Sequence, residues 1–314
     1  MIKSHLRQIA YLSGTRADFG LMASSLRLID EDPRLSLGLI VTGMHLSDRF
    51  GMTVREIEDE GFSITARVSV DVDTSSGAVM ASNIGHMLVG FVRALELNRP
   101  DILVLLGDRG EMLAGALAAI HLRIPIVHLH GGERSGTVDE SVRHAISKFA
   151  NLHLVTTSSS RDRLIRMGEE SEFIHVVGAP GVDGLVELAT LNRRELCEQI
   201  CFDHTLPVVL VIYHPVLNEA MEASQQVLCL VEAALSIGSQ VLALMPNSDD
   251  GSDAIRDVLT LKYREGSIAL RTHLKRSEFV SWMAAVDVMI GNSSSGIIEA
   301  STFGTPVVNV GSRQ

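Results

Sequence analysis

The sequence predicts an α/β fold of two Rossmann-like domains, each a doubly wound parallel sheet, with a ligand cleft between them. Short, unbroken runs of valine, isoleucine and leucine recur along the chain, as expected of parallel strands that are covered on both faces. Amphipathic segments lie between these runs, and such alternation of strands and helices is typical of parallel sheets. The 314 residues also exceed what one hydrophobic core usually holds, which is about 250–300 residues.

The apolar runs predict the strands in order. The first domain is expected to hold strands at residues 9–12, 37–41, 102–106, 126–129, 152–156 and 175–177. The second is expected to hold strands at residues 208–212, 241–244, 268–270, 286–290 and 307–310. Helical spacing of apolar residues is seen at Ile84, Met87, Leu88, Phe91 and Leu95, and at Leu113, Ala116, Leu117 and Ile120. In such sheets, ligands bind at the carboxyl ends of the strands.

The domain boundary is predicted near residue 180. A glycine- and proline-containing turn at residues 178–181 closes the first series of strands, and a polar helix at residues 192–200 precedes the second. We therefore expect domains at residues 1–180 and 181–314. Because the predicted strand at 307–310 has nothing after it to cover its sheet, we expect that a C-terminal part of the second domain is missing.

Composition restricts the possible partners. Hydrophobic residues make up 46% of the chain and charged residues 21%, enough for a buried core. A net charge of −11 argues against nucleic acid or an anionic membrane as the main partner. Three cysteines without CxxC spacing (Cys197, Cys201 and Cys229) fit a reduced, cytoplasmic protein rather than a metal site. No apolar run is long enough for a signal peptide or a membrane span.

The loop after the first strand predicts an anion site. Residues 13–20 form a glycine-containing turn before a helix expected from about Leu21, and free N–H groups at a helix start attract negative charge. Arg16 would add a forked phosphate donor, and Asp18 belongs to the same turn. Neither GxGxxG nor a P-loop is present, so a capped helix start with a surface arginine is an equal alternative.

Two further loops of the first domain carry acids and bases. Asp108 directly follows a buried strand and a glycine, so it is either a site residue or the N-cap of the next helix. Strand alternation sends His128 and His130 to the same side; we expect His128 in the core and His130 at a ligand. The charged segment 131–144 then predicts proton transfer on a bound anion, with Asp139 opening a helix.

In the second domain, polar turns again follow the strands. His214 comes directly after one strand and is a candidate phosphate contact or acid, or else an isolated histidine. The turn 291–296 contains three serines between two glycines, which predicts backbone and hydroxyl donors for a diphosphate. The following helix is expected at residues 297–303, with Glu299 in its first turn as an acceptor for a ribose diol.

Together these loops resemble the hydrolysing UDP-N-acetylglucosamine 2-epimerases of sialic and legionaminic acid pathways. The resemblance covers the whole chain and rests on the segments 14–19, 107–109, 131–139, 143–148, 214–216, 291–296 and 303–309. It implies a GT-B fold, a UDP-sugar substrate, no metal or other cofactor, and a homo-oligomer (a dimer or tetramer).

The resemblance also implies a mechanism. A base removes the C2 proton as UDP leaves, and water then adds to the resulting glycal while C2 is protonated from the opposite face. Asp108 and Asp139 match catalytic carboxylates, and Glu133 and His214 complete the expected acid and base groups. The expected substrate contacts are Arg16, Asp18, Arg109, Asn247, Asp250, His273, Ser293, Ser294, Gly296, Glu299 and Arg313.

His130 departs from the family pattern. Many relatives carry a catalytic glutamate at this position. A histidine here, followed by Gly-Gly-Glu, resembles the pattern of relatives that act on 2,4-diacetamido-6-deoxy sugars. A neutral imidazole can move a proton near pH 7, so we expect His130 to be catalytic and leave the sugar open between these two classes. The alternatives are a GT-B glycosyltransferase and a non-catalytic protein that binds sugar nucleotides.

Overall fold

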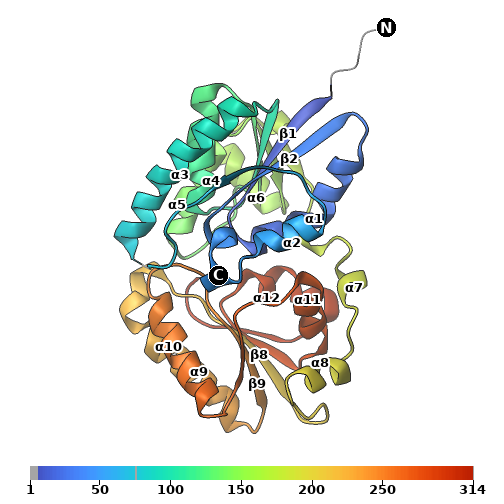
Figure 1. Cartoon of the computed structure of the whole chain (residues 1–314), viewed down its shortest axis with the longest axis vertical. Coiled ribbons are helices and arrows are strands. Elements are labelled where there is room, and N and C mark those ends of the chain that lie inside the picture. The colour runs from blue at the N-terminus through green and yellow to red at the C-terminus, as the bar shows by residue number, and fades with distance from the viewer. Residues whose placement is uncertain (1–5, 75, 314) are drawn as a thin grey trace. The chain divides into compact units, whose positions relative to one another are not determined.

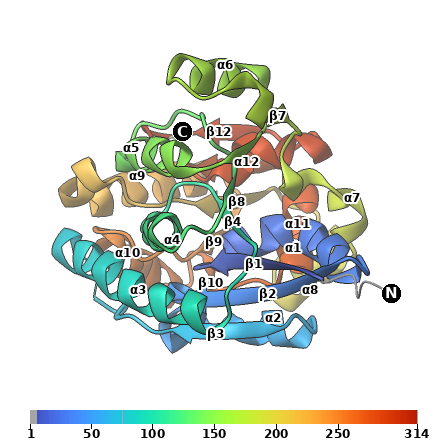
Figure 2. The ribbon, with the colours of Figure 1, turned by 90° about the horizontal axis from the view of Figure 1, so that it is seen from above.

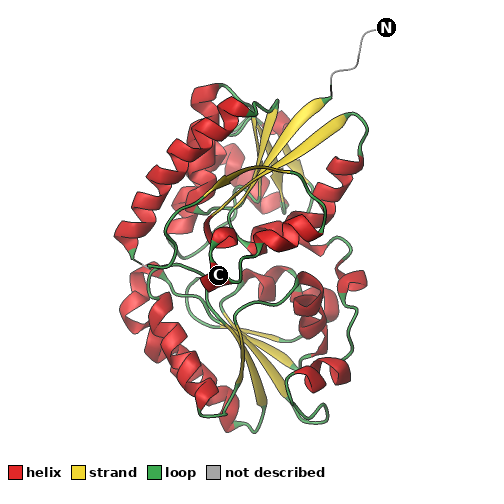
Figure 3. Ribbon diagram, in the orientation of Figure 1, coloured by secondary structure: helices red, strands yellow, loops and turns green. Residues whose placement is uncertain are grey.

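The computed structural model describes residues 6–74 and 76–313. The chain divides into two compact units, Met1–Thr74 with Ala78–Gly181, and Ser75–Gly77 with Val182–Gln314. Each unit is built on one parallel sheet with helices on both of its faces (Figure 1 and Figure 3). We describe the two units separately, because each sheet carries its own loops at its carboxyl edge.

The first unit contains a seven-stranded sheet with the order β3-β2-β1-β4-β5-β6-β7. Its strands are β1 (Arg7–Ser13), β2 (Leu35–Thr42), β3 (Ile64–Val68), β4 (Ile102–Leu106), β5 (Ile126–Leu129), β6 (Leu152–Val155) and β7 (Ile174–Val176). All neighbouring strands run parallel. The sequence missed only β3 in this unit. It is an edge strand in which Thr65 and Arg67 are exposed, so it lacks a continuous apolar run.

Helices cover both faces of this sheet and enclose two separate cores. On one face lie α3 (Gly77–Leu97), α4 (Gly110–Leu122) and α5 (Val138–Phe149), with Phe91, Met112 and Ile146 buried. On the other lie α1 (Arg16–Glu31) and α2 (Val54–Asp59), with Met22 and Ile57 buried. Helix α6 (Ser158–Arg166) packs near β6 and β7, and the short helical turns are η1 (Gly43–Leu46), η2 (Asp48–Phe50), η3 (Ser171–Phe173) and η4 (Pro180–Val182).

Helix α3 is the one described helix that is long and apolar enough to cross a membrane by length and composition. A core helix passes the same test. Met87, Phe91 and Leu95 of α3 are buried in the sheet core, and a Cβ atom on Gly90 would lie 2.4 Å from a methyl group of Val68 in β3. Figure 2 shows α3 running alongside β3. Packing on the sheet thus accounts for these buried apolar residues of α3, whereas Val89 and Leu97 of the same helix are exposed.

The second unit contains a five-stranded parallel sheet with the order β10-β9-β8-β11-β12. Its strands are β8 (Val208–Ile212), β9 (Gln240–Leu244), β10 (Ala269–Arg271), β11 (Val288–Gly291) and β12 (Val307–Asn309). One face is covered by α9 (Ala223–Ser236) and α10 (Ser252–Arg264), the other by α8 (Arg193–Gln199), α11 (Arg276–Ala285) and η6 (Ala300–Phe303). The remaining helical segments are α7 (Leu185–Leu188), η5 (Leu217–Glu222) and α12 (Ser294–Ile298).

Both sheets reverse their strand order at one point. In the first unit the reversal lies between β1 and β4, and in the second between β8 and β11. Ligands of open α/β sheets bind outside the carboxyl ends of the strands at such a point. Four of the loops that the sequence singled out, those after β1, β4, β8 and β11, begin at these two positions, whereas the loops after β5 and β9 begin one strand further from the reversal.

Candidate active site

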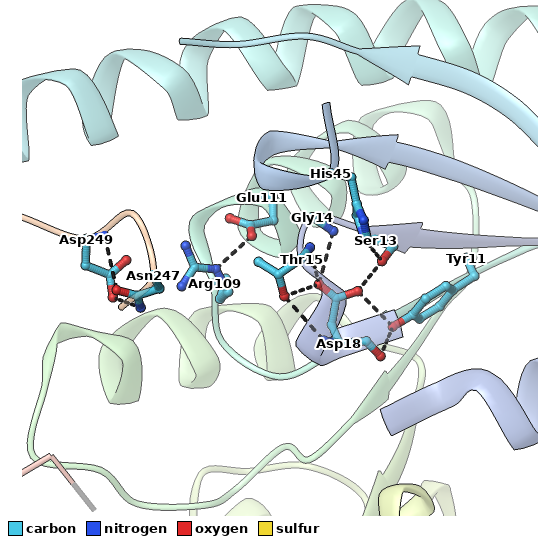
Figure 4. Close-up of polar contacts among 10 residues, drawn as sticks. All are labelled: Tyr11, Ser13, Gly14, Thr15, Asp18, His45, Arg109, Glu111, Asn247 and Asp249. Atoms are coloured by element: carbon cyan, nitrogen blue, oxygen red, sulfur yellow. Dashed lines mark hydrogen bonds and ion pairs between the residues drawn. The ribbon is translucent and has the colours of Figure 1, made fainter. Parts of the chain in front are cut away.

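The loop after β1 is organised by the carboxylate of Asp18 (Figure 4). One oxygen, Oδ2, accepts hydrogen bonds from the backbone N–H groups of Gly14 at 3.1 Å and Thr15 at 2.7 Å. The other, Oδ1, accepts from the hydroxyls of Tyr11 and Ser13. Thr15 Oγ1 in turn accepts from the Asp18 N–H at 3.3 Å, which completes a capping box. Helix α1 therefore begins at Arg16, and the expected start near Leu21 is wrong, because the Thr15–Asp18 box caps the chain earlier.

A buried hydrogen-bond chain extends from Asp18. Ser13 Oγ lies 2.8 Å from His45 Nε2, and His45 Nδ1 lies 2.8 Å from Thr53 Oγ1. Ser13 and His45 are fully buried and Thr53 nearly so. The Ser13 hydroxyl has one hydrogen, which it donates to Asp18. Towards His45 it can therefore only act as an acceptor, so the Nε2 atom of this histidine carries a proton. The sequence did not single out His45, which follows β2 in a short helical turn with no recognisable pattern.

Burial raises the pKa of Asp18 to about 6, against the opposing effect of its hydrogen bonds from Ser13 and Thr15. The folded protein thus holds a proton between about pH 4 and 6 that the unfolded chain has lost. Asp18 therefore stabilises the folded protein by about 3 kcal/mol below about pH 4. This stabilisation is lost as the pH rises through 6.

Asp18→Asn should remove this dependence. As the pH rises from about 4 to about 7, the unfolding free energy of the variant should increase relative to that of the wild type, because only the wild type loses the stabilisation from a protonated Asp18. Urea unfolding of both proteins at matched pH measures it, and groups common to both proteins, such as His128, cancel. A difference that is independent of pH would contradict a buried, protonatable Asp18.

Gly14 brings the loops after β1 and β4 together. A Cβ atom at Gly14 would lie 2.4 Å from Glu111 Oε1, and one at Gly43 would lie 3.1 Å from the Gly14 carbonyl oxygen. Arg109 Nε donates to the same Glu111 oxygen at 2.8 Å. A side chain at position 14 would therefore displace the Glu111 carboxylate from this contact, and Arg109 lies beside the turn at the reversal point of the sheet. Arg16, half-buried, is the first residue of α1.

Asp108 forms an ion pair with Arg143 from α5. The N-cap of α4 is Arg109, without a side-chain cap, so the alternative that Asp108 serves as the N-cap is wrong. Arg143 is buried and lies four residues after Asp139, on the same face of the helix. The ion pair therefore holds Asp108 against the face of α5 that carries Asp139.

Helix α5 begins as the sequence predicts. Thr137 is its N-cap and accepts a hydrogen bond from the Asp139 N–H at 3.2 Å, while its hydroxyl donates to Asp139 Oδ2 at 2.8 Å. The Asp139 side chain is half-buried. A carboxylate in the first turn also interacts favourably with the helix dipole. This carboxylate is thus both fixed in position and open to a partner from outside.

His128 is a core histidine, as expected. Its ring is fully buried, with Nε2 2.7 Å from the carbonyl oxygen of Gly107 and Nδ1 3.1 Å from Ser147 Oγ. Burial lowers its pKa to about 4, so the ring is neutral at pH 7 and its Nε2–H donates to the carbonyl. It thereby fixes the residue before Asp108, which is a glycine with a φ of 82°.

His130 lies beyond the strand. Because β5 ends at Leu129 and His130 has a φ of 61°, strand alternation does not relate it to His128, and that expectation is wrong. Its Nδ1 atom lies 3.5 Å from Glu133 Oε1, and the same oxygen accepts from Thr156 Oγ1 at 2.7 Å. Burial lowers the pKa of His130, against the opposing charge of Glu133. The structure thus brings His130 and Glu133 together at this edge.

In the second unit, His214 is held by Asn292. The His214 N–H donates to Asn292 Oδ1, and Asn292 Nδ2 donates back to the His214 carbonyl, both at 2.8 Å. The Asn247 N–H donates to His214 Nδ1 at 3.3 Å, which leaves the proton of the neutral ring on Nε2. Sequence reasoning missed Asn292 as a positioning residue, although it is fully buried and directly precedes the predicted serine turn.

The serine turn follows β11 and begins α12. Ser293 is the N-cap and accepts from the Ser295 N–H at 3.4 Å, and Ser294 is half-buried. A Cβ atom at Gly296 would lie 2.9 Å from a methyl group of Val307, so this glycine allows α12 to pack closely on β12. The expected helix at 297–303 is wrong in its start. It is α12 followed by η6, since Ser293 caps the chain three residues earlier than expected.

Glu299 is at the C-cap of α12, so the expectation that it lies in the first turn is wrong. It is buried, and it accepts a hydrogen bond from Arg276. Burial raises its pKa, against the charge and hydrogen bond of Arg276. This pair fixes the carboxylate at the end of α12, and its contact with a ribose stays a prediction.

The remaining predicted contacts of the second unit are distributed over its loops. Arg313 Nη1 donates to the Asn292 carbonyl oxygen at 3.3 Å. The carboxylate of Asp250 accepts from the Gly77 N–H at 3.2 Å, and the Asn247 side chain donates to Asp249. His273 is half-buried between β10 and α11. Among residues 6–74 and 76–313, no group of three histidine, cysteine or acidic side chains could hold a metal ion.

Comparison with known proteins gives the family. The model of the UDP-N-acetylglucosamine 2-epimerase family matches residues 27–314. The chain belongs to this family. It is 49% identical over 98% of its length to a hydrolysing UDP-N,N'-diacetylbacillosamine 2-epimerase of Legionella pneumophila, of which it spans 82%. It is 34% identical over 98% of its length to a UDP-N-acetylglucosamine 2-epimerase of Neisseria meningitidis, of which it spans 81%.

Solved structures of this family share the fold. A UDP-GlcNAc 2-epimerase from Neisseria meningitidis, bound to UDP-GlcNAc, superposes with a TM-score of 0.81 at 17% identity and covers 96% of this chain and 82% of its own. A Methanocaldococcus jannaschii enzyme in complex with UDP-GlcNAc and UDP gives a TM-score of 0.78 at 17% identity, covering 97% and 89%. The predicted fold class, two parallel-sheet α/β domains of GT-B type, is confirmed.

Proposed function

We propose that this chain is a hydrolysing 2-epimerase, which converts a UDP-linked 2-acetamido sugar into UDP and the free sugar with inverted configuration at C2. The observation that carries the proposal is the group of acids and bases at one edge of the first sheet. Asp108 pairs there with Arg143 of α5, the helix that carries Asp139 in its first turn, and His130 lies 3.5 Å from Glu133. A reaction that moves protons and expels a diphosphate needs such groups.

The second unit supplies donors for the diphosphate in this proposal. These donors are the Nε2–H of His214, in the loop after β8, and the hydroxyls of Ser293 and Ser294, in the turn after β11. The sheet order reverses between these two strands. Charge that develops on a departing phosphate is stabilised by donors fixed in advance. Glu299 binds the ribose. Arg16, Asp18, Arg109, Asn247, Asp250, His273, Gly296 and Arg313 complete the proposed binding set.

The chemistry proceeds in two steps. First, a base takes the proton from C2, the C–H electrons form the C1=C2 bond, and the C1–O electrons leave with UDP. Then water adds its oxygen to C1 of the glycal while C2 receives a proton on the opposite face. Two separate proton carriers are needed, since the two protons pass on opposite faces of the ring. The carboxylates of Asp108 and Asp139 and the His130–Glu133 pair provide them.

The substrate we propose is UDP-N,N'-diacetylbacillosamine. The higher identity to the Legionella pneumophila relative, 49% against 34% for the Neisseria meningitidis one, supports a 2,4-diacetamido-6-deoxy sugar. The product would then serve the synthesis of nonulosonic acids of the legionaminic type. A cytoplasmic homodimer or homotetramer stays a prediction.

Direct comparison of the two substrates tests this proposal. The protein is incubated separately with UDP-N-acetylglucosamine and UDP-N,N'-diacetylbacillosamine, and the released sugar is identified by NMR. We expect UDP and a free 2-epimerised sugar from both, with kcat/KM at least about tenfold higher for the diacetamido substrate, a difference of about 1.4 kcal/mol. Preference for UDP-N-acetylglucosamine would overturn the substrate assignment. UDP release only in the presence of a sugar acceptor would indicate a glycosyltransferase.

A further inference from the structure

The backbone of His130 has a conformation that is uncommon for residues other than glycine. Its φ of 61° is in the left-handed region, which only three other non-glycine residues among 6–74 and 76–313 adopt. Such a conformation costs about 1–2 kcal/mol for a residue with a Cβ atom. The His130 N–H donates to the Leu154 carbonyl of β6 at 3.1 Å, which holds the turn in place. A strained residue at the carboxyl edge of a sheet indicates a functional constraint on its side chain.

The imidazole of His130 is buried with one nitrogen unsatisfied. Its side chain is 8% exposed. Nδ1 lies 3.5 Å from Glu133 Oε1, whereas Nε2 is buried and has no hydrogen-bond partner among the described residues. An unpaired buried polar atom costs about 1–3 kcal/mol. A bound molecule at the carboxyl edge of the sheet would supply the missing partner at Nε2, and the left-handed turn sets the position of this ring beyond the end of β5.

Glu133 is itself held from a second strand. Thr156, directly after β6, donates its hydroxyl hydrogen to Glu133 Oε1 at 2.7 Å. The carboxylate accepts from this hydroxyl and faces Nδ1 of His130 with the same oxygen. Since a carboxylate partner favours a proton on Nδ1, the lone pair of the neutral ring lies on Nε2.

We propose that His130 is the base that meets the sugar, and that Glu133 and Thr156 are positioning residues that act through it. This proposal rests on the function proposed above and divides the work between His130 and Glu133. The C2 proton passes to His130 Nε2, the C–H electrons form the C1=C2 bond, and the C1–O electrons leave with UDP. The Glu133 carboxylate stabilises the resulting imidazolium, and Thr156 fixes that carboxylate. Asp108 and Asp139 then serve the opposite face of C2.

A second buried histidine provides the matched control. His153 Nε2 lies 3.3 Å from Glu169 Oε2, and its Nδ1 also has no hydrogen-bond partner among the described residues. However, His153 lies within β6, and Glu169 also pairs with Lys148. This pair has the same chemistry without the left-handed turn or the position at the carboxyl edge, so it should be structural only.

The test compares His130→Gln, Glu133→Gln, Thr156→Val, Thr156→Ser and Glu169→Gln in the full chain. The rate with UDP-N,N'-diacetylbacillosamine is measured against pH, and UDP affinity is measured by calorimetry. His130→Gln should lower kcat about 10³-fold with UDP affinity unchanged. Glu133→Gln should lower kcat about 10–100-fold, and it should move the acidic limb of kcat/KM about one unit to lower pH, because the imidazolium loses its counter-charge.

Thr156→Val should lower kcat about 3–10-fold, a smaller loss than that of Glu133→Gln because it removes only the outer hydrogen bond. Thr156→Ser should restore the rate, and Glu169→Gln should leave both rate and pH profile unchanged.

A Glu133 variant that is inactive while His130→Gln still turns over would overturn the proposal. An unshifted acidic limb in Glu133→Gln would also overturn it. Failure of the wild-type protein to release a free 2-epimerised sugar would instead refute the proposed function, so the two outcomes are distinguishable.

Discussion

Asp139→Asn is expected to lower kcat by about 10³-fold while leaving UDP affinity unchanged. Asparagine has nearly the same shape and can still accept the hydrogen bond from Thr137, so the start of α5 is preserved. It cannot carry a proton, and general acid–base catalysis typically contributes about 10²–10⁴-fold. Steady-state rates of UDP release and calorimetric UDP titrations measure the two quantities.

Asp253→Asn is the control for this variant. Asp253 is also an acidic residue in the first turn of a helix, α10, and its side chain is exposed. It shares the interaction with a helix dipole but not the proposed chemistry, so kcat should stay within about twofold of the wild-type value, as expected for an exposed surface substitution. A large loss of UDP affinity with turnover intact in Asp139→Asn would contradict its assignment as a proton carrier.

Gly291→Ala is expected to destabilise the second unit by about 4 kcal/mol or more and to abolish UDP binding. The φ of Gly291 is 144°, and a Cβ atom there would lie 1.9 Å from the carbonyl oxygen of Ile212 in β8. Neither backbone can move without disturbing the pairing of β8 with β11. The adjacent His214–Asn292 bonds would be lost with it. Such large effects arise from steric conflict at a special backbone position.

Gly304→Ala separates strain from collision. Gly304 has a φ of 68°, and a Cβ atom there would meet nothing within 4 Å. Its substitution should cost only the conformational penalty, about 1–2 kcal/mol. Urea unfolding and UDP calorimetry of both variants give the comparison. Equal destabilisation by the two substitutions would show that the contact with Ile212 does not limit the turn.

Apolar runs determine most of this fold, and the sequence therefore predicted it well. Each interior strand is covered on both faces, so β4 and β8 are continuous runs of valine, leucine and isoleucine. The edge strand β3 was missed because its side chains alternate between half-buried and exposed positions, which leaves no continuous apolar run. Helix starts were predicted too late at α1 and α12, where Thr15 and Ser293 cap the chain within the turns.

The sequence predicted which loops carry the candidate site residues but not the contacts within those loops. The ends of the apolar runs are visible in the sequence, and the structure places Asp108 and His214 just after β4 and β8, as expected. Their roles in a reaction stay predictions. The role of Asn292 depends on two hydrogen bonds to a residue 78 positions away, for which the sequence has no local signal. Likewise, the left-handed backbone of His130 and its shared partner Glu133 depend on Thr156 and β6, which only the folded chain brings together.

The most direct test of proton exchange at C2 is to run the reaction in heavy water. UDP-N,N'-diacetylbacillosamine is incubated with the wild-type protein, and the released sugar is analysed by NMR. We expect free sugar with inverted configuration at C2 and one deuterium at that carbon, because the proton is removed and replaced from solvent-exchangeable groups. Release of a free sugar that retains its original hydrogen at C2 would contradict the account.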